Sequence, residues 1–153
     1  MKKRNQNKIN VYVDMDGVIA DFFAEENAVE RFENEHHFFR ILRPKNKWAF
    51  EQLLANESVN VFILSASPNR RCDKDKKAWL NFYFPQIKRR NIIIMRNGKK
   101  KVDYMKTENG ILLDDYGKNC REWLEKKGNR SIKVEQDLAT YFKEFLVLPI
   151  LDY

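Results

Sequence analysis

This chain is predicted to adopt an α/β fold with an open parallel sheet, because short apolar runs alternate with amphipathic segments along it. Runs typical of buried strands lie at residues 11–13, 59–64, 91–95, 110–113 and 131–134. Strands separated by helices of about ten residues imply β-α-β units with right-handed crossovers. With 153 residues, 43% of them hydrophobic, the chain can form one core but not two ordinary domains. We therefore expect a single domain over residues 1–153.

Helical spacing of apolar residues predicts the intervening segments. Residues 20–39 are predicted to form one helix with an apolar face, and further helices are expected at 45–55, 70–84, 116–127 and 136–148. A break is expected at Pro44, and Pro85 and Gly128 end two of the helices. These predictions also fix the side chains that should face the core: Trp48, Leu53, Trp79, Phe82, Tyr83, Cys120, Trp123 and Leu124.

The charge balance favours anionic ligands without specifying one. There are 29 Lys and Arg against 22 Asp and Glu, a formal net charge of +7. The excess is concentrated at residues 1–4, 88–90 and 99–101, and the first two clusters are interpreted as solvated surface charge. His36 and His37 are adjacent and lack metal-ligand spacing, so both are assigned ordinary surface or packing roles.

The cysteines and the termini indicate the compartment. Cys72 and Cys120 are not in metal or redox spacing and are interpreted as free thiols of a reducing compartment. No targeting segment or run of membrane-spanning length is recognised, so a cytoplasmic protein is expected. Residues 1–8 are expected to fray, and the apolar residues 146–153 to pack on the core or form a dimer contact.

Chemically complementary groups follow three of the predicted strands. Asp14 and Asp16 follow the first, Ser65 ends the second, and Asp114 and Asp115 end the fourth. The carboxyl ends of parallel strands meet at one edge, so these groups should share a crevice. Four carboxylates in one crevice repel each other and require a cation, and all-oxygen donors suit Mg²⁺. A magnesium site is therefore predicted there.

Each signal alone has a simpler interpretation. The DxDG sequence also occurs in calcium loops, but Val18 and Phe22 replace ligands that such a loop needs. Ser65 alone would be a strand-end cap, and Asp115 alone a helix N-cap before Tyr116. Their order, each after an apolar strand, favours the shared site.

The segments VYVDMDGVIADF, FILSASP, GKKKVDY and ILLDDYGKN together resemble the motifs of the haloacid dehalogenase-like phosphatase superfamily. Within it the chain is most similar to the 5'(3')-deoxyribonucleotidase group, over residues 10–134. The resemblance implies a three-layer Rossmann-like open parallel sheet with a small helical cap insert, here reduced to about residues 22–47. It also implies an Mg²⁺-dependent phosphomonoesterase.

The resemblance also implies roles for individual residues. Asp14 matches the nucleophile that forms an aspartyl-phosphate, and Asp16 the general acid and base, a role that suits a carboxyl group with a raised pKa. Lys101 best matches the lysine that neutralises transition-state charge, with Lys100 as the fallback; which of Lys99, Lys100 and Lys101 takes this role stays open. Lys100 is also expected to contact the substrate. Asp14, the main-chain carbonyl of Asp16, Asp114 and Asp115 match the Mg²⁺ ligands; which of the last two is a direct ligand stays open.

Substrate-binding residues are expected at the end of the second strand and in the cap. Ser65 and Ala66 are expected to bind the phosphoryl group, and Phe22 matches an aromatic that stacks on the base. Further stacking candidates, for which packing of the cap on the core is the alternative, are Phe38, Phe39 and Trp48.

Three functions remain open from sequence. The favoured one is a nucleotidase acting on (deoxy)ribonucleoside monophosphates. The net charge and short cap leave a nucleic-acid end phosphatase as an alternative, and a non-catalytic phosphate-ligand or nucleic-acid binding module on the same fold is the third. Base and sugar preference, oligomeric state and host or phage origin are not determined.

Overall fold

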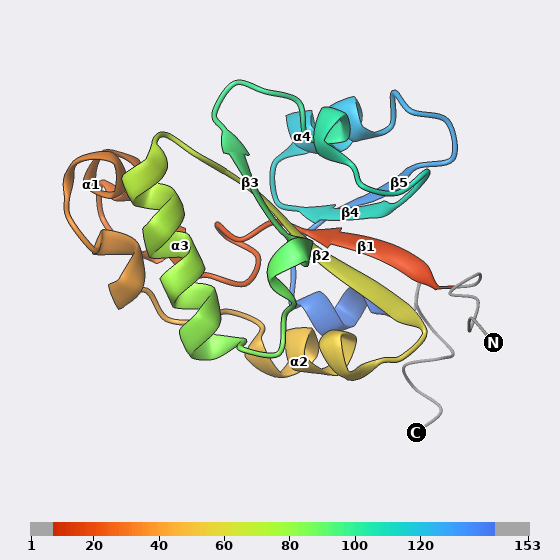
Figure 1. Ribbon diagram of the computed structural model, residues 1–153, viewed down its shortest axis with the longest axis horizontal. Coiled ribbons are helices and arrows are strands. Elements are labelled where there is room, and N and C mark those ends of the chain that lie inside the picture. The colour runs from red at the N-terminus through yellow and green to blue at the C-terminus, as the bar shows by residue number, and fades with distance from the viewer. Residues whose placement is uncertain (1–7, 143–153) are drawn as a thin grey trace.

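A three-layer α/β architecture is found in the computed structural model, which describes residues 8–142 (Figure 1). Its five-stranded sheet has the order β3-β2-β1-β4-β5, and all neighbouring strands pair in parallel. The strands are β1 (Ile9–Val13), β2 (Val59–Ser67), β3 (Ile92–Arg96), β4 (Ile111–Asp114) and β5 (Arg130–Lys133). The predicted α/β fold with a parallel sheet is therefore confirmed, and each predicted apolar run lies in a strand.

Helices cover both faces of the sheet (Figure 1). On one face lie α1 (Ala28–Asn34), α2 (Lys47–Ala55) and α3 (Arg70–Tyr83), which share a buried cluster with Val11, Val13 and Ile63. On the other lies α4 (Gly117–Trp123), whose Trp123 packs with Tyr12. Short 3-10 helices complete the fold: η1 (Phe22–Ala24), η2 (Phe38–Ile41), η3 (Arg89–Asn91), η4 (Lys101–Tyr104) and η5 (Leu138–Tyr141).

The single helix predicted for residues 20–39 is wrong. The segment forms η1, α1 and η2, separated by Asn27 and His37 in the left-handed region at φ 53° and 63°. On one straight helix, Phe22 and Phe32 would point about 80° apart. The breaks let both rings enter the same cluster, with centroids 5.8 Å apart. Burial of aromatic side chains therefore overrides helical continuity here.

Three predicted core side chains are exposed instead. Trp48, Phe82 and Leu124 are 67%, 77% and 52% exposed, whereas Trp79 and Trp123 are buried as predicted. On α3 the buried stripe includes the charged residues Asp75 and Lys76. The helix predicted from periodicity is therefore present as α3, but the face of α3 that packs on the core does not include Phe82.

Two predicted helices have different ends. α4 ends at Trp123, and Gly128, at φ +90°, lies in the turn that follows. Of the segment 136–148, the structure describes η5, and the rest lies outside residues 8–142, as do the predictions for residues 1–7 and 146–153. Cys72 and Cys120 are buried free thiols. Within residues 8–142, no helix is long and apolar enough to cross a membrane.

Candidate active site

A tight turn after β1 positions the first two carboxylates. The amide of Asp14 donates to the Leu113 carbonyl of β4 (3.0 Å), which continues the sheet one residue beyond β1. The Met15 carbonyl then accepts from the amides of Val18, Ile19 and Ala20 at 3.1, 3.0 and 2.9 Å. This compact turn holds Asp14 and Asp16 at the carboxyl edge of the sheet.

Gly17 is required in this turn for two reasons. Its φ is +80°, a conformation that L residues with a side chain rarely adopt. A Cβ at this position would also lie 2.1 Å from Oδ2 of Asp115. The glycine therefore lets the turn after β1 approach the residue after β4.

The acidic residues predicted from sequence meet around one cavity of about 360 Å³. Its walls come from the turns after β1, β3 and β4 and from the carboxyl end of β2, as expected for this edge of a parallel sheet. The lining residues are Asp14, Asp16, Phe23, Ala66, Asn97, Lys101, Asp114, Asp115, Tyr116 and Asn119.

Lys101 bridges the two buried carboxylates. It begins η4 and is 3% exposed. Its Nζ donates to Oδ1 of Asp14 at 2.9 Å and to Oδ2 of Asp114 at 2.7 Å. Lys100 points elsewhere and pairs with Glu125 at 3.0 Å on the surface. Of the three lysines considered from sequence, Lys99, Lys100 and Lys101, it is Lys101 that contacts the acidic cluster.

Asp114 and Asp115 differ in their surroundings. Asp114 is fully buried: Oδ1 accepts from the amide of Tyr116 (2.9 Å), and Oδ2 also accepts from Nδ2 of Asn119 (3.0 Å). Asp115 is half-buried, lines the cavity and faces Gly17. Asp114 is therefore held by the protein, whereas Asp115 presents its carboxylate to the cavity.

A second buried lysine, Lys76 of α3, was missed from sequence. It is 0% exposed, and its Nζ donates to Oγ of Ser65 and to the carbonyl of Ala66, both at 2.7 Å. The same Nζ lies 3.2 Å from the Asp16 carboxylate and about 5 Å from the centroids of the Phe32 and Phe39 rings. The sequence signal that could have revealed its burial is its position four residues after Cys72, on the apolar stripe of α3.

Ser65 and Ala66 have separate positions. The hydroxyl of Ser65 is fully buried and hydrogen-bonds Lys76, whereas Ala66 lines the cavity. Ser65 therefore reaches the site through Lys76, and the backbone around Ala66 lies at the cavity itself.

Phe22, which is expected from sequence to stack on a base, does not line the cavity, whereas its neighbour Phe23 does. Phe22 is 3% exposed and packs in the core with Phe32, Phe38 and Phe39. Phe23 is 62% exposed, lines the cavity, and meets the Phe22 ring edge-on at 5.0 Å. The burial of Phe38 and Phe39 supports their interpretation as packing residues, and Trp48 does not line this cavity.

The electrostatics of the site reflect crowded carboxylates. Burial, and then repulsion from Asp114, raises the pKa of Asp14 well above its usual value despite Lys101. The same two causes raise the pKa of Asp115 to about 6. For Lys101, burial opposes protonation, but Asp14 and Asp114 outweigh it and raise the pKa of the ammonium group.

The residues present fit a divalent cation. Asp14, Asp114 and Asp115 each offer an oxygen, and these atoms lie within 4.8 Å of one another. Together with Asp16 they carry four negative charges, against the two positive charges of Lys76 and Lys101, which leaves a formal −2. Oxygen donors and this charge are what Mg²⁺ prefers.

The fold and the acidic edge define the class of protein: a haloacid dehalogenase-like domain. Residues 24–146 match the family described as "5' nucleotidase, deoxy (Pyrimidine), cytosolic type C protein". This match covers most of the chain, which therefore belongs to that family and to its class of phosphatase and nucleotidase hydrolases. It begins after Asp14 and Asp16, which lie outside the matched residues. No curated protein matches the chain.

Solved structures show the same fold. The haloacid dehalogenase domain of effector protein Lem4 from Legionella pneumophila is 19% identical, with a TM-score of 0.53, covering 94% of this chain and 96% of that one. A chain in the structure of a Pnkp1/Rnl/Hen1 complex is 16% identical, with a TM-score of 0.58, covering 84% of this chain. This chain spans 47% of that longer one.

Proposed function

We propose that this protein is a Mg²⁺-dependent phosphomonoesterase that hydrolyses nucleoside monophosphates through an aspartyl-phosphate. The observation that carries the proposal is the contact of Lys101 with both Asp14 and Asp114 beside Asp115, in one cavity. Membership of a family of nucleotidases supports the substrate class. The family's description as cytosolic, together with two buried free thiols, supports a cytoplasmic location.

In the first half-reaction, a carboxylate oxygen of Asp14 attacks phosphorus and the bond to the ester oxygen breaks. Asp16 gives its proton to the departing alkoxide, which leaves as a nucleoside. Lys101 neutralises charge next to Asp14. Lys76 holds Ser65, Ala66 and Asp16 in a fixed arrangement, so little reorganisation is needed as charge develops.

In the second half-reaction, Asp16 accepts a proton from water, and the resulting hydroxide attacks the aspartyl-phosphate. Inorganic phosphate leaves and the Asp14 carboxylate is regenerated. Asp14, Asp115 and Asp114 would hold Mg²⁺, which would draw charge from the phosphoryl oxygens in both steps.

We further propose that Phe23 and Tyr116 contact the nucleobase. Both rings are exposed, at 62% and 58%, and both line the cavity that contains the carboxylates. Exposed rings beside a phosphate site offer faces on which a base stacks. Phe22 would act indirectly, by supporting the Phe23 ring edge-on.

The deciding experiment measures phosphate release with Mg²⁺ from ribo- and deoxyribonucleoside 5'- and 3'-monophosphates, sugar phosphates and a phosphorylated oligonucleotide. Asp14→Asn is the matched control because it keeps the side-chain shape and removes the nucleophile. We expect the unmodified protein to release phosphate from nucleotides and the Asp14→Asn variant to release none. We also expect borohydride to trap an acyl phosphate at Asp14 of the unmodified protein. Release from the oligonucleotide alone would indicate an end phosphatase instead, and no release from any phosphomonoester would overturn the proposal in favour of a binding module.

A further inference from the structure

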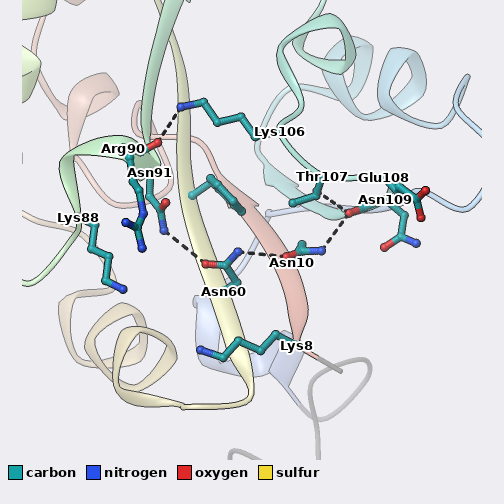
Figure 2. A pocket seen from close by; sticks show the side chains of 11 residues that line it. Lys8, Asn10, Asn60, Lys88, Arg90, Asn91, Lys106, Thr107, Glu108 and Asn109 are labelled. Atoms are coloured by element: carbon teal, nitrogen blue, oxygen red, sulfur yellow. Dashed lines mark hydrogen bonds between the residues drawn. The ribbon is translucent and has the colours of Figure 1, made fainter. Parts of the chain in front are cut away.

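A cavity of about 720 Å³ lies at the opposite, amino edge of the sheet (Figure 2). Its walls are the start of β1, the start of β2, the turn that includes η3, and the loop before β4. The lining residues are Lys8, Asn10, Asn60, Phe62, Lys88, Arg90, Asn91, Lys106, Thr107, Glu108 and Asn109. None of them belongs to the carboxylate cavity, so this is a separate site.

The floor of the cavity is a row of side-chain amides. Asn10 and Asn60 are register partners, two residues before Tyr12 and Phe62, whose face of the sheet packs against Trp123. Asparagine is depleted in strands, and here it occupies a part of the sheet that opens into a cavity. Figure 2 shows the row continuing from Asn60 to Asn91, which precedes β3.

Hydrogen bonds fix these amides without using all of their capacity. Nδ2 of Asn60 donates to Oδ1 of Asn10 (3.2 Å), and Nδ2 of Asn91 donates to Oδ1 of Asn60 (3.4 Å) and to the Val61 carbonyl (3.0 Å). Among residues 8–142, Oδ1 of Asn91 and the carboxamide of Asn109 have no such partner. The floor is therefore ordered and retains groups that can bind a ligand.

The rim of the cavity is strongly positive. Lys8, Lys88, Arg90 and Lys106 line it against one carboxylate, Glu108. In the described part of the chain none of the four cations has a carboxylate within 4.0 Å, and Lys106 Nζ instead donates to the Arg90 carbonyl (2.7 Å). Like charges gathered around one concavity favour an anionic ligand.

The spacing of the cations indicates what kind of anion fits. In Figure 2 Lys8, Lys88 and Lys106 project from different sides of the cavity and do not converge on one point. Cations arranged around a rim in this way suit a ligand whose negative charges are distributed along a chain. The carboxamides can hydrogen-bond the Watson–Crick edges of bases, which are free in an unpaired strand.

We propose that this cavity binds a single-stranded nucleic acid, with its phosphodiester backbone on Lys8, Lys88, Arg90 and Lys106 and its bases over the asparagine floor. The site is independent of the hydrolytic one. Failure of the nucleotidase proposal would leave this proposal standing, because it involves neither Asp14 nor a terminal phosphate.

The test measures fluorescence anisotropy of a labelled ten-nucleotide thymidine strand that has hydroxyl groups at both ends, so that no phosphomonoester is present. Lys88→Ala/Arg90→Ala is expected to raise Kd at least tenfold. The slope of log K against log salt should fall by about 1.4, since each phosphate contact in a single strand contributes about 0.7. The matched control, Lys74→Ala/Arg121→Ala, also removes two exposed cations and should change Kd less than twofold.

A second variant probes the floor. Asn60→Asp places a carboxylate among the amides and is expected to raise Kd at least fivefold, with phosphatase activity unchanged. The proposal is overturned if the strand does not bind at low salt, or if both double variants weaken binding equally. Tighter binding of a heparin oligosaccharide than of the strand would equally overturn it.

Discussion

Nζ of Lys101 lies 2.9 Å from Oδ1 of Asp14, although the two residues are 87 positions apart in the chain. Burial and acidic neighbours raise the pKa of Asp14, and Lys101 is the nearby charge that most opposes this increase in pKa. The pair links the proposed nucleophile, which follows β1, to η4, and through Asp114 to β4. Removal of Lys101 therefore leaves two buried carboxylates without their shared cation, whereas removal of Asp14 leaves Lys101 paired with Asp114.

Lys101→Met should destabilise the protein by about 3–5 kcal/mol, because Asp14 and Asp114 lose their shared cation in a buried site. Mg²⁺ should recover part of this loss by replacing the missing charge. Urea unfolding in EDTA and in Mg²⁺ measures both effects. Lys100→Met removes an exposed cation and should change the unfolding free energy by less than about 0.5 kcal/mol. Equal losses in the two variants would contradict the bridging role.

Lys76→Met should lower kcat at least hundredfold while the protein remains folded. Methionine fills the space beside Phe32 and Phe39, but Ser65 and the Ala66 carbonyl lose their partner, at a cost of about 1–3 kcal/mol in stability. Steady-state kinetics and circular dichroism separate the two effects. The adjacent Lys77 is exposed, so Lys77→Met should behave as the unmodified protein does. A near-normal kcat for Lys76→Met would exclude its role.

Gly17→Ala should raise the Mg²⁺ concentration for half-maximal activity at least tenfold, since the new Cβ displaces Asp115. Gly98→Ala provides the control. Gly98 has a similar φ of +85° but no atom within 4 Å of an added Cβ, so it carries only the backbone strain of about 1–2 kcal/mol. The same Mg²⁺ dependence in both variants would show that strain alone is responsible.

Phe22→Ala and Phe23→Ala should have opposite signatures. Phe22 is buried among aromatic rings, so its truncation should cost about 3–5 kcal/mol of unfolding free energy. Truncation of the exposed Phe23 should leave stability within about 0.5 kcal/mol but raise KM for nucleotides more than for deoxyribose 5-phosphate. A KM effect of the same size on both substrates would argue against stacking on the base.

Loss of the ion pair between Asp73 and Arg96 should make the protein less stable as the pH falls. Burial alone would raise the pKa of Asp73, but hydrogen bonds from Arg96 and Ser67 outweigh it and lower the pKa below the usual 3.8. A carboxylate with a lowered folded-state pKa stabilises the fold above pH 3.8, and this contribution disappears as pH falls through the folded pKa. Urea midpoints between pH 6 and 2.5 should therefore decline less steeply for Asp73→Asn. Asp103→Asn, at an exposed carboxylate, should keep the original profile.

The fold was accessible from sequence because hydrophobic periodicity is local. Each apolar run became a strand, since residues buried on both faces of a sheet must be continuously apolar. The residues at the ends of those runs could then be assigned to one edge. The segment of residues 20–39 was not accessible in this way, because its breaks at Asn27 and His37 depend on which rings share a cluster.

The candidate site was accessible only in part. Asp14, Asp114 and Asp115 are placed by strand ends, so sequence order located them. The position of Lys76 depends on how α3 packs against the sheet. A lysine in a polar helix is expected to be solvated unless the face of the helix that carries it is known to be buried. Sequence also did not show that Phe23, and not Phe22, lines the cavity. The conformation of η1 determines which of these two adjacent rings faces the core.

The sequence by itself determined the parallel sheet and the acidic edge, because strand burial and its termination are encoded within a few residues. Only the tertiary structure decided which lysines contact the carboxylates, which aromatic ring meets the cavity, and that three distant asparagines form one floor. These contacts join segments tens of residues apart. Their partners follow from how helices rotate and dock against the sheet, and the local pattern does not specify that.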